Sequence, residues 1–191
     1  HLSIRRQRQM CIRDRIITVN PATGETIAKH ETLDENAIDA KLETATRAYR
    51  EWRTSDIDRR VAVLEKLGRL YTDRKEDLAR LAVTEMGKPI TQARAEVEKC
   101  ASLFAYLAEA GPAMLESEFW DLSDGGRAEG RWLPQGPVLA VMPWNFPYWQ
   151  VARFLAPTVM AGNVGLLKHA SIVQGVGARI EELVLEAGAP E

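Results

Sequence analysis

The sequence predicts an α/β protein: a mainly helical first half, then Rossmann-like parallel strands that alternate with helices. Three observations predict it. Apolar residues recur at helical spacing from residue 34 to residue 112 with few breaks. Two continuous apolar runs, Val138–Met142 and Val164–Lys168, have the character of buried strands. Each run precedes a helical pattern, and a strand–helix–strand–helix order implies parallel strands with right-handed crossovers.

The first 15 residues differ in charge from the rest of the chain. They carry five arginines against one aspartate. A basic arm or a mitochondrial presequence would have this charge. The run from Gln7 to Arg15 resembles translated cloning-adapter sequence more than protein, however. Residues 1–15 are therefore interpreted as non-native, and the functional interpretation begins at Ile16.

Residues 16–115 predict a short strand followed by four helices. Ile16–Val19 is the strand, and the turn at residues 20–24 follows it. Each helix has an apolar stripe along one face. The helices begin near Asp34, at Ser55 or Asp56 as the cap, near Lys75 and at Pro89. Gly87 is expected to end the third helix, and Gly111-Pro112 the fourth.

The second half is predicted from its turn residues and its apolar runs. Residues 116–137 combine glycine-rich turns with two aromatic segments and predict a hairpin or two short strands. Phe146–Met160 predicts a helix with Pro147 near its first turn, and Pro157 is expected to kink or end it. Gln174–Ala187 predicts the last helix, which Gly188 closes. A sheet of two parallel strands would expose an apolar edge, so we expect further protein to complete it.

Composition excludes several classes of function. The 191 residues are 46% hydrophobic and 27% charged, with a formal net charge of −2. This balance favours neither a nucleic-acid surface nor a membrane surface, and no apolar run approaches the roughly 20 residues that span a bilayer. Cys11 and Cys100 lack metal-ligand spacing and indicate no oxidising compartment, so we expect a cytoplasmic protein without a metal site. Cys100 lies on an apolar helix face and is expected to be core packing.

The loop after the first apolar strand, Met142-Pro-Trp-Asn-Phe-Pro147, contains the side chain best suited to chemistry. A carboxamide fixed at the carboxyl edge of a sheet can donate a hydrogen bond to a developing oxyanion, which contributes roughly 3 kcal/mol. Asn145 is therefore a candidate catalytic residue. The alternative is that Asn145 caps the following helix, which is the commoner role on chemistry alone. Trp144 is likewise more often a core residue than a cofactor contact.

The end of the second apolar strand carries a possible anion site. Lys168 ends the strand, and Ser171 precedes a helix, an arrangement that suits a phosphate or a ribose. A solvated lysine with a capping serine is the commoner alternative. His169 is a further possible phosphate contact, although a plain turn residue is the simpler interpretation. Gly162-Asn-Val-Gly165 lacks the GxGxxG spacing and precedes a strand, so it is no dinucleotide fingerprint.

Four motifs together resemble the aldehyde dehydrogenase superfamily, in the family's order and at its approximate spacing. They are Asn20-Pro-Ala-Thr-Gly-Glu25, Glu85-Met-Gly-Lys-Pro89, Met142-Pro-Trp-Asn-Phe-Pro147, and Ala161-Gly-Asn163 leading to Leu167-Lys168. Three other stretches are most similar to bacterial NAD(P)-dependent succinate-semialdehyde dehydrogenases. These are the stretches 110–115, 147–153 and 167–170. The resemblance covers only the first part of a typical member.

The resemblance implies roles for particular residues. Asn145 matches the oxyanion-hole asparagine, which stabilises the thiohemiacetal formed when a catalytic cysteine attacks an aldehyde. Lys168 matches the lysine that binds the adenosine ribose or its phosphate. Members strict for NAD usually have glutamate in place of Ser171, so serine there allows NADP. The cofactor-binding positions implied are Met142, Pro143, Trp144, Asn145, Lys168, His169, Ala170 and Ser171.

The resemblance also implies an architecture and a reaction. Residues 16–115 match the N-terminal part of the cofactor-binding domain, 116–137 the start of the oligomerisation strands, and 138–191 an incomplete NAD(P)-binding sheet. The implied protein is a homodimer or homotetramer at full length that oxidises an aldehyde, expected to be succinate semialdehyde, with NADP or NAD. The family's nucleophilic cysteine and general-base glutamate lie downstream of residue 191, so the chain alone is expected to be inactive. The alternatives are another aldehyde substrate, or a non-catalytic binding or structural relative.

Overall fold

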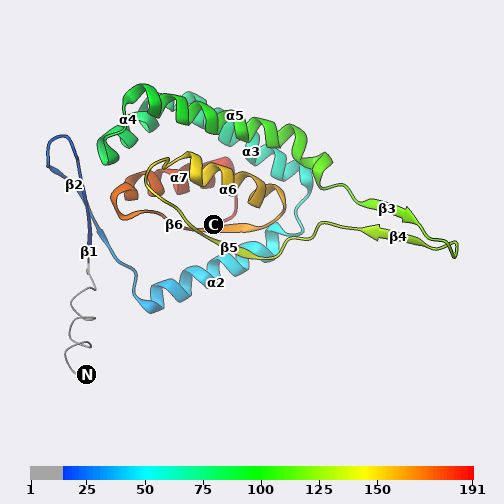
Figure 1. The fold of residues 1–191 in the computed structure, drawn as a ribbon. Coiled ribbons are helices and arrows are strands. Elements are labelled where there is room, and N and C mark those ends of the chain that lie inside the picture. The colour runs from blue at the N-terminus through cyan, green and yellow to red at the C-terminus, as the bar shows by residue number, and fades with distance from the viewer. Residues whose placement is uncertain (1–14) are drawn as a thin grey trace.

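A computed structural model describes residues 15–191 and arranges them in layers (Figure 1). At the centre, β5 (Pro137–Val141) and β6 (Val164–Lys168) form a parallel two-stranded sheet, as predicted. Helix α6 (Trp149–Met160) connects the two strands and packs on one side of them, while α2 (Glu35–Trp52) packs on the other (Figure 1). The predicted strand–helix–strand unit is therefore confirmed.

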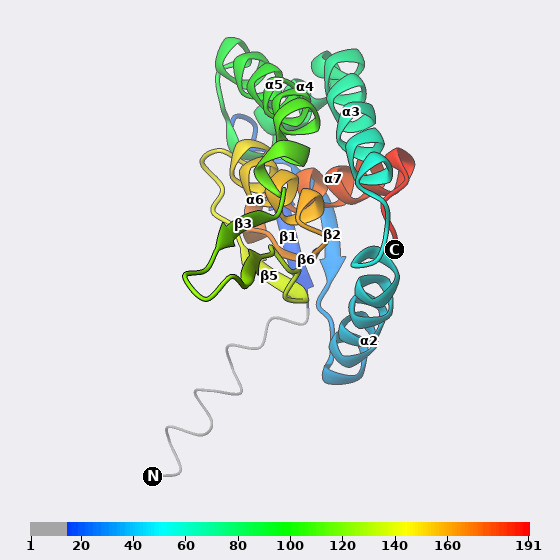
Figure 2. The same ribbon diagram turned by 90° about the vertical axis from the view of Figure 1, so that its right-hand side faces the viewer.

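A second layer of helices lies beyond α6. It consists of α3 (Ile57–Asp73), α4 (Lys75–Met86) and α5 (Ile90–Met114). In both views this layer is on the far side of α6 and α7 (Gln174–Ala187) from the sheet (Figure 2). The short 3-10 turn η1 (Ser171–Val173) leads into α7.

The core lies between the helical layer and α6, where the predicted apolar stripes meet. Leu64 and Leu67 of α3 and Val97 and Phe104 of α5 are fully buried. Burying each such side chain contributes about 1.5–3 kcal/mol. The Tyr71 ring meets the Phe104 ring edge-on, with ring centroids 5.1 Å apart, which joins the two helices.

Local chemistry sets several helix ends where the sequence places them. Asp34 caps α2 by accepting a hydrogen bond from the Ala37 amide at 2.8 Å. Gly87 adopts a left-handed conformation with φ of 74° and ends α4, as predicted. The predicted N-cap position of α3 is confirmed at Asp56, but the Asp56 side chain makes no capping bond, and the Ser55 hydroxyl donates to the Trp52 carbonyl at 2.7 Å instead.

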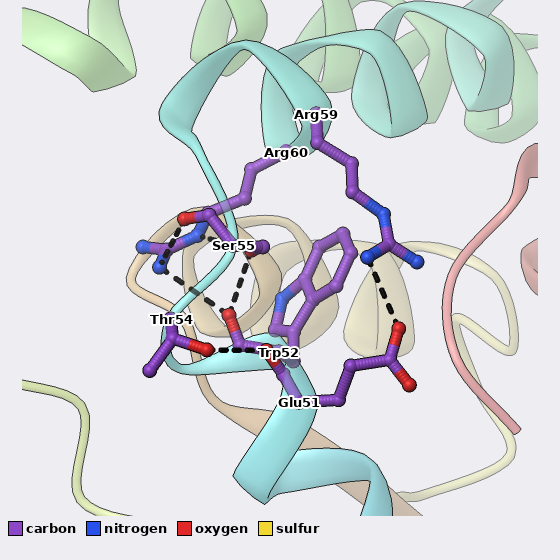
Figure 3. A network of polar contacts seen from close by, with 6 residues as sticks. All are labelled: Glu51, Trp52, Thr54, Ser55, Arg59 and Arg60. Carbon is purple, nitrogen blue, oxygen red and sulfur yellow. Dashed lines mark hydrogen bonds and ion pairs between the residues drawn. The ribbon is translucent and has the colours of Figure 1, made fainter.

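Arg60 is the reason that Ser55 is engaged elsewhere. Its guanidinium lies among the carbonyls at the end of α2, whereas Arg59 turns to Glu51 (Figure 3). Arg60 donates to the Ser55 hydroxyl and carbonyl, each at 3.0 Å, and to the Met160 carbonyl at 3.2 Å. One side chain therefore ties the α2–α3 turn to the end of α6, and its N–H groups donate to the Trp52 and Arg53 carbonyls, which the end of α2 leaves without helical partners.

One predicted helix end beside a proline is wrong, and another is confirmed. Helix α5 does not end at Gly111-Pro112 but continues to Met114. Gly111 is buried against Met160, where an added Cβ would lie 2.7 Å from a side-chain carbon, so packing on α6 supports this last turn. Helix α6 ends at Met160, as predicted, and Pro157 does not end it earlier, because the last turn packs in the core and Ala161 donates to the Pro157 carbonyl at 2.9 Å.

The start of α6 is also later than expected. The helix begins at Trp149 instead of Phe146, and Pro147 precedes it. The strand β2 (Thr26–Glu31), which the sequence did not predict, pairs antiparallel with β1 (Arg15–Val19). Its residues are mostly polar and exposed or half-buried, so it lacks the apolar pattern of a core strand.

The predicted hairpin is confirmed and projects from the body of the molecule (Figure 1). It consists of β3 (Glu118–Asp121) and β4 (Arg127–Gly130). In its turn, the Gly126 amide donates to the Asp124 carboxylate at 2.9 Å. The second aromatic segment, residues 131–133, is not a strand. Phe119 and Trp120 are each 50% exposed, so the hairpin offers an uncovered aromatic surface.

The segment interpreted as non-native lies outside the described residues except for its last member. Arg15 begins β1 and forms an ion pair with Glu31 at 2.9 Å, so this residue belongs to the fold. The expected exposed apolar edge is present, because Leu139 and Val141 of β5 are each 64% exposed. No helix among residues 15–191 combines the length and apolarity that a membrane crossing requires.

Candidate functional site

The loops that follow β5 and β6 lie side by side at the carboxyl edge of the sheet. The Met142 amide donates to the Lys168 carbonyl at 3.1 Å, and a ring nitrogen of His169 meets the Pro147 carbonyl at 2.9 Å. Parallel α/β sheets bind ligands at this edge. The structure thus brings together the two segments, 142–147 and 168–171, that the sequence singled out.

Asn145 is exposed at this edge, and its carboxamide makes no hydrogen bond within residues 15–191. The alternative in which Asn145 caps the next helix is wrong, because α6 begins only at Trp149. Trp144 is 51% exposed and is no core residue either. The Asn145 donors therefore remain available to a ligand oxygen.

Lys88 holds the backbone of Asn145 through a hydrogen bond. The Lys88 ammonium donates to the Asn145 carbonyl at 3.0 Å and forms a buried ion pair with Glu96. It also lies 4.0 Å from the centroid of the Phe146 ring. Lys88 lies in the link between α4 and α5, so the helical layer is in direct contact with the loop that carries Asn145.

Glu96 continues this contact into the first turn of α6. Its carboxylate accepts hydrogen bonds from the amides of Tyr148 at 2.8 Å and Trp149 at 2.9 Å. Helix N-termini leave such amides unpaired and carry a partial positive charge, so a carboxylate there is stabilising. Glu96 therefore caps α6 from a neighbouring helix.

Glu85 does the same for α7. Its carboxylate accepts from the amides of Gly175 at 2.8 Å and Val176 at 2.9 Å. A Cβ on Gly175 would lie 2.6 Å from a carboxylate oxygen, so the close approach requires glycine. Burial raises the pKa of the Glu85 carboxyl, and the two amides oppose this shift. The capping serine proposed as an alternative is wrong, since Glu85 fills that role and Ser171 lies earlier, at the start of η1.

Lys168 and Ser171 are both exposed, as a ligand contact requires. His169 is different, because it is buried. Its Nδ1 accepts from the Ala170 amide at 2.9 Å, so in the neutral ring Nε2 carries the proton and donates to the Pro147 carbonyl. Burial lowers the pKa of His169, which favours this neutral form. His169 is thus more than a plain turn residue, because its ring links the two loops, and its contact with a cofactor stays a prediction.

The sequence interpretation missed the three supporting residues Glu85, Lys88 and Glu96. A signal existed for each. Glu85 and Lys88 belong to the Glu85-Met-Gly-Lys-Pro89 motif. Helix ends explain Gly87 and Pro89 in this motif, but the local sequence gives no structural reason for Glu85 or Lys88. Glu96 is three residues from Ala93 and four from Cys100, so it lies on the buried face of its helix. A buried carboxylate needs hydrogen-bond or charge partners, so an acid on the apolar face of this helix indicated such a contact.

The exposed side chains at this edge include donors that suit an anion. Among residues 15–191 there is no cluster of histidine, cysteine and acidic side chains that could hold a metal ion. The Lys168 ammonium and the Ser171 hydroxyl are exposed donors of the kind that bind ribose and phosphate oxygens. Cys100 is fully buried, and burial raises the pKa of its thiol, so it is core packing as predicted. The site thus provides anion donors, and this part of the chain exposes no thiol nucleophile beside them.

Comparison with known proteins agrees with this geometry. Residues 9–191 match the profile of the Aldehyde dehydrogenase family. The succinate semialdehyde dehydrogenase [NAD(P)+] Sad of Escherichia coli (strain K12) is 43% identical over 175 residues, which are 92% of this chain and 38% of that protein. Succinate-semialdehyde dehydrogenase [NADP(+)] 1 of Mycobacterium tuberculosis (strain ATCC 25618 / H37Rv) is 40% identical over 178 residues, 92% of this chain and 39% of that protein.

Solved structures give the same result. The crystal structure of succinic semialdehyde dehydrogenase from Streptococcus pyogenes in complex with NADP+ superposes with a TM-score of 0.86 and 35% identity, covering 92% of this chain and 39% of that one. The chain thus spans about two-fifths of the length of these relatives. On the match from residue 9 to residue 191, the chain belongs to the aldehyde dehydrogenase family.

Proposed function

We propose that this chain supplies the oxyanion donor and part of the cofactor site of an enzyme that oxidises an aldehyde to its carboxylic acid with NADP or NAD. The observation that carries the proposal is the exposed Asn145 carboxamide, free of hydrogen bonds within residues 15–191, on a loop whose backbone is held by a buried ion pair. A donor placed in advance, with no competing partner in the chain, is what oxyanion stabilisation requires.

Asn145 acts at the aldehyde oxygen. When a nucleophile from outside the described residues adds to the carbonyl carbon, the oxygen gains negative charge, and the Asn145 N–H stabilises that charge. The same donor serves the second tetrahedral species, when water adds to the acyl group and releases the acid. The nicotinamide, when bound, accepts the hydride that leaves the carbon between these two stages.

Lys168 and Ser171 are proposed to hold the adenosine end of the cofactor. The ammonium of Lys168 binds ribose or phosphate oxygens, and the Ser171 hydroxyl donates to a 2′-phosphate without repelling it. The position next to β6, at the ligand-binding edge of the sheet, supports this role. The relatives in Mycobacterium tuberculosis and Streptococcus pyogenes carry NADP in their names or complexes, which also supports it.

The substrate proposed is succinate semialdehyde, because relatives that are 43% and 40% identical are named for it. A comparison of kcat/KM across a panel of aldehydes decides between this substrate and another aldehyde. The exposed aromatic hairpin supports a homodimer or homotetramer at full length. The cytoplasmic location stays a prediction.

To test the proposal, the whole gene that encodes this chain is expressed, and the reduction of NADP and NAD is measured with succinate semialdehyde as the substrate. We expect activity, and Asn145→Ala should lower kcat about 100- to 1,000-fold. Asn20→Ala is the matched control, because Asn20 is a turn residue whose carboxamide accepts from the Ala22 amide. Unchanged kcat in Asn145→Ala, or a wild-type protein without activity toward any aldehyde, would contradict the proposal.

A further inference from the structure

Burying the ion pair of Lys88 and Glu96 carries a large desolvation penalty. The side chains are only 5% and 1% exposed. Taking two charges out of water costs several kcal/mol per ion, and replacing such a pair by apolar residues is often neutral or stabilising. Fold stability alone therefore does not account for the pair, and its contacts point to a second role.

Apart from the ion pair itself, every side-chain hydrogen bond of Lys88 and Glu96 within residues 15–191 is with the segment 145–149. Lys88 binds the Asn145 carbonyl and lies against the Phe146 ring. Glu96 binds the amides of Tyr148 and Trp149, and also binds Lys88 itself. The residue with the free carboxamide is thus held at its own carbonyl, and the helix that follows it is held at its first amides.

Helix capping does not require the lysine. Glu85 caps α7 through two amides at the same distances as Glu96 caps α6. No lysine pairs with Glu85 in the described part of the chain. The α6 junction therefore differs from the α7 junction by the presence of Lys88. Besides Glu96 and the Phe146 ring, the Lys88 ammonium contacts the Asn145 carbonyl.

We infer that Lys88 and Glu96 are positioning residues that orient Asn145 for oxyanion stabilisation. Lys88 holds the carbonyl, Glu96 fixes Lys88 and the first turn of α6, and the carboxamide is left exposed and without a hydrogen bond within residues 15–191. This inference rests on the proposed function. A misplacement of about 1 Å at a reacting group can cost about 100-fold in rate, so support at the backbone is sufficient to matter.

The decisive variant is the double substitution Lys88→Met with Glu96→Gln. It removes both charges together, so no buried charge is left unpaired, and the glutamine oxygen still accepts from the Tyr148 and Trp149 amides. The Asn145 carbonyl loses its donor, and the Phe146 ring loses its cation. In the product of the whole gene we expect kcat to fall about 10- to 100-fold, with KM for NADP changed less than about twofold.

Trp52→Phe is the matched control, because it acts on the other end of the same helix. It removes the buried hydrogen bond from Trp52 Nε1 to the Val159 carbonyl, which measures 3.0 Å. We expect a lower Tm with kcat unchanged. If the control lowers kcat as much as the double variant, the effect is general loosening of α6, and the inference is overturned.

A second measurement needs no activity. Backbone order parameters of the Trp144, Asn145 and Phe146 amides in the 191-residue chain should fall from about 0.85 to below about 0.6 in the double variant, while those of Gly175 and Val176 stay high. Unchanged order at Asn145, or lost order with unchanged kcat, would overturn the inference. A wild-type protein that is inactive would instead overturn the proposed function, and the order parameters alone would then decide whether the pair holds this loop.

Discussion

The junctions that lead into α6 and α7 are built alike but differ in one residue. Each helix follows a strand of the parallel sheet, and a buried glutamate from the helical layer accepts hydrogen bonds from two of its first amides at 2.8 and 2.9 Å. Glu96, at α6, is paired with Lys88, whereas Glu85, at α7, caps without such a partner. The comparison shows that a glutamate from the helical layer can accept hydrogen bonds from the first amides of a helix without a lysine partner.

Lys88 is therefore found at the junction where the loop before the helix, which carries Asn145, is held as well. Lys88 reaches past its carboxylate to the Asn145 carbonyl. At the other junction, the loop before α7 is held by the His169 ring, which meets the Pro147 carbonyl of the first loop. The second loop is thus tied to the first, and the first is tied to the helical layer.

The largest expected effect is that of Lys88→Met alone. It leaves the Glu96 carboxylate buried without its counter-ion, which should cost about 3–5 kcal/mol in the free energy of unfolding. Urea denaturation of the 191-residue chain measures it. The double variant with Glu96→Gln should recover most of the loss. A single variant as stable as the double would show that the two amides suffice for Glu96 as well, and the contrast between the junctions would disappear.

A smaller effect is expected at the other junction from Gly175→Ala. The new methyl group would lie 2.6 Å from the Glu85 carboxylate and displace it, leaving amides unpaired at a cost of about 1–3 kcal/mol. Gly177→Ala is the matched control, since its Cβ would meet only the His169 side chain, at 3.5 Å or more, and alanine favours a helix by up to about 1 kcal/mol. Equal stability of the two variants would mean that the Glu85 cap contributes little.

The smallest effect concerns pH. Burial raises the folded-state pKa of Glu85 above its unfolded value, so the folded state binds this proton more tightly than the unfolded state does. Ionisation of Glu85 therefore costs stability. The free energy of unfolding of the wild type, minus that of Glu85→Gln, should fall as the pH rises from the unfolded pKa of about 4.3 through the raised folded pKa, and then level off. A difference that rises across this range would show that the amides outweigh burial.

Local chemistry allowed much of the fold to be predicted from the sequence. Helix α4 runs from Lys75 to Met86 as expected, because a left-handed glycine ends a helix whatever surrounds it. The strands β5 and β6 and the hairpin between residues 116 and 137 followed from apolar runs and turn residues in the same way. The errors fall where packing overrides a local signal, as at Pro112, where contact with α6 supports a turn that proline disfavours.

The sequence by itself determined which residues lie at the sheet edge, since Lys168 ends a strand whose pattern is local, and Asn145 and Ser171 follow such strands. Only the tertiary structure decided what holds them there. The bonds from Glu96 to Tyr148, Lys88 to Asn145 and Glu85 to Gly175 join residues 52, 57 and 90 positions apart. Helical periodicity and turn preferences act over a few neighbouring residues, whereas a buried charge finds its partner only when the helical layer packs on the sheet.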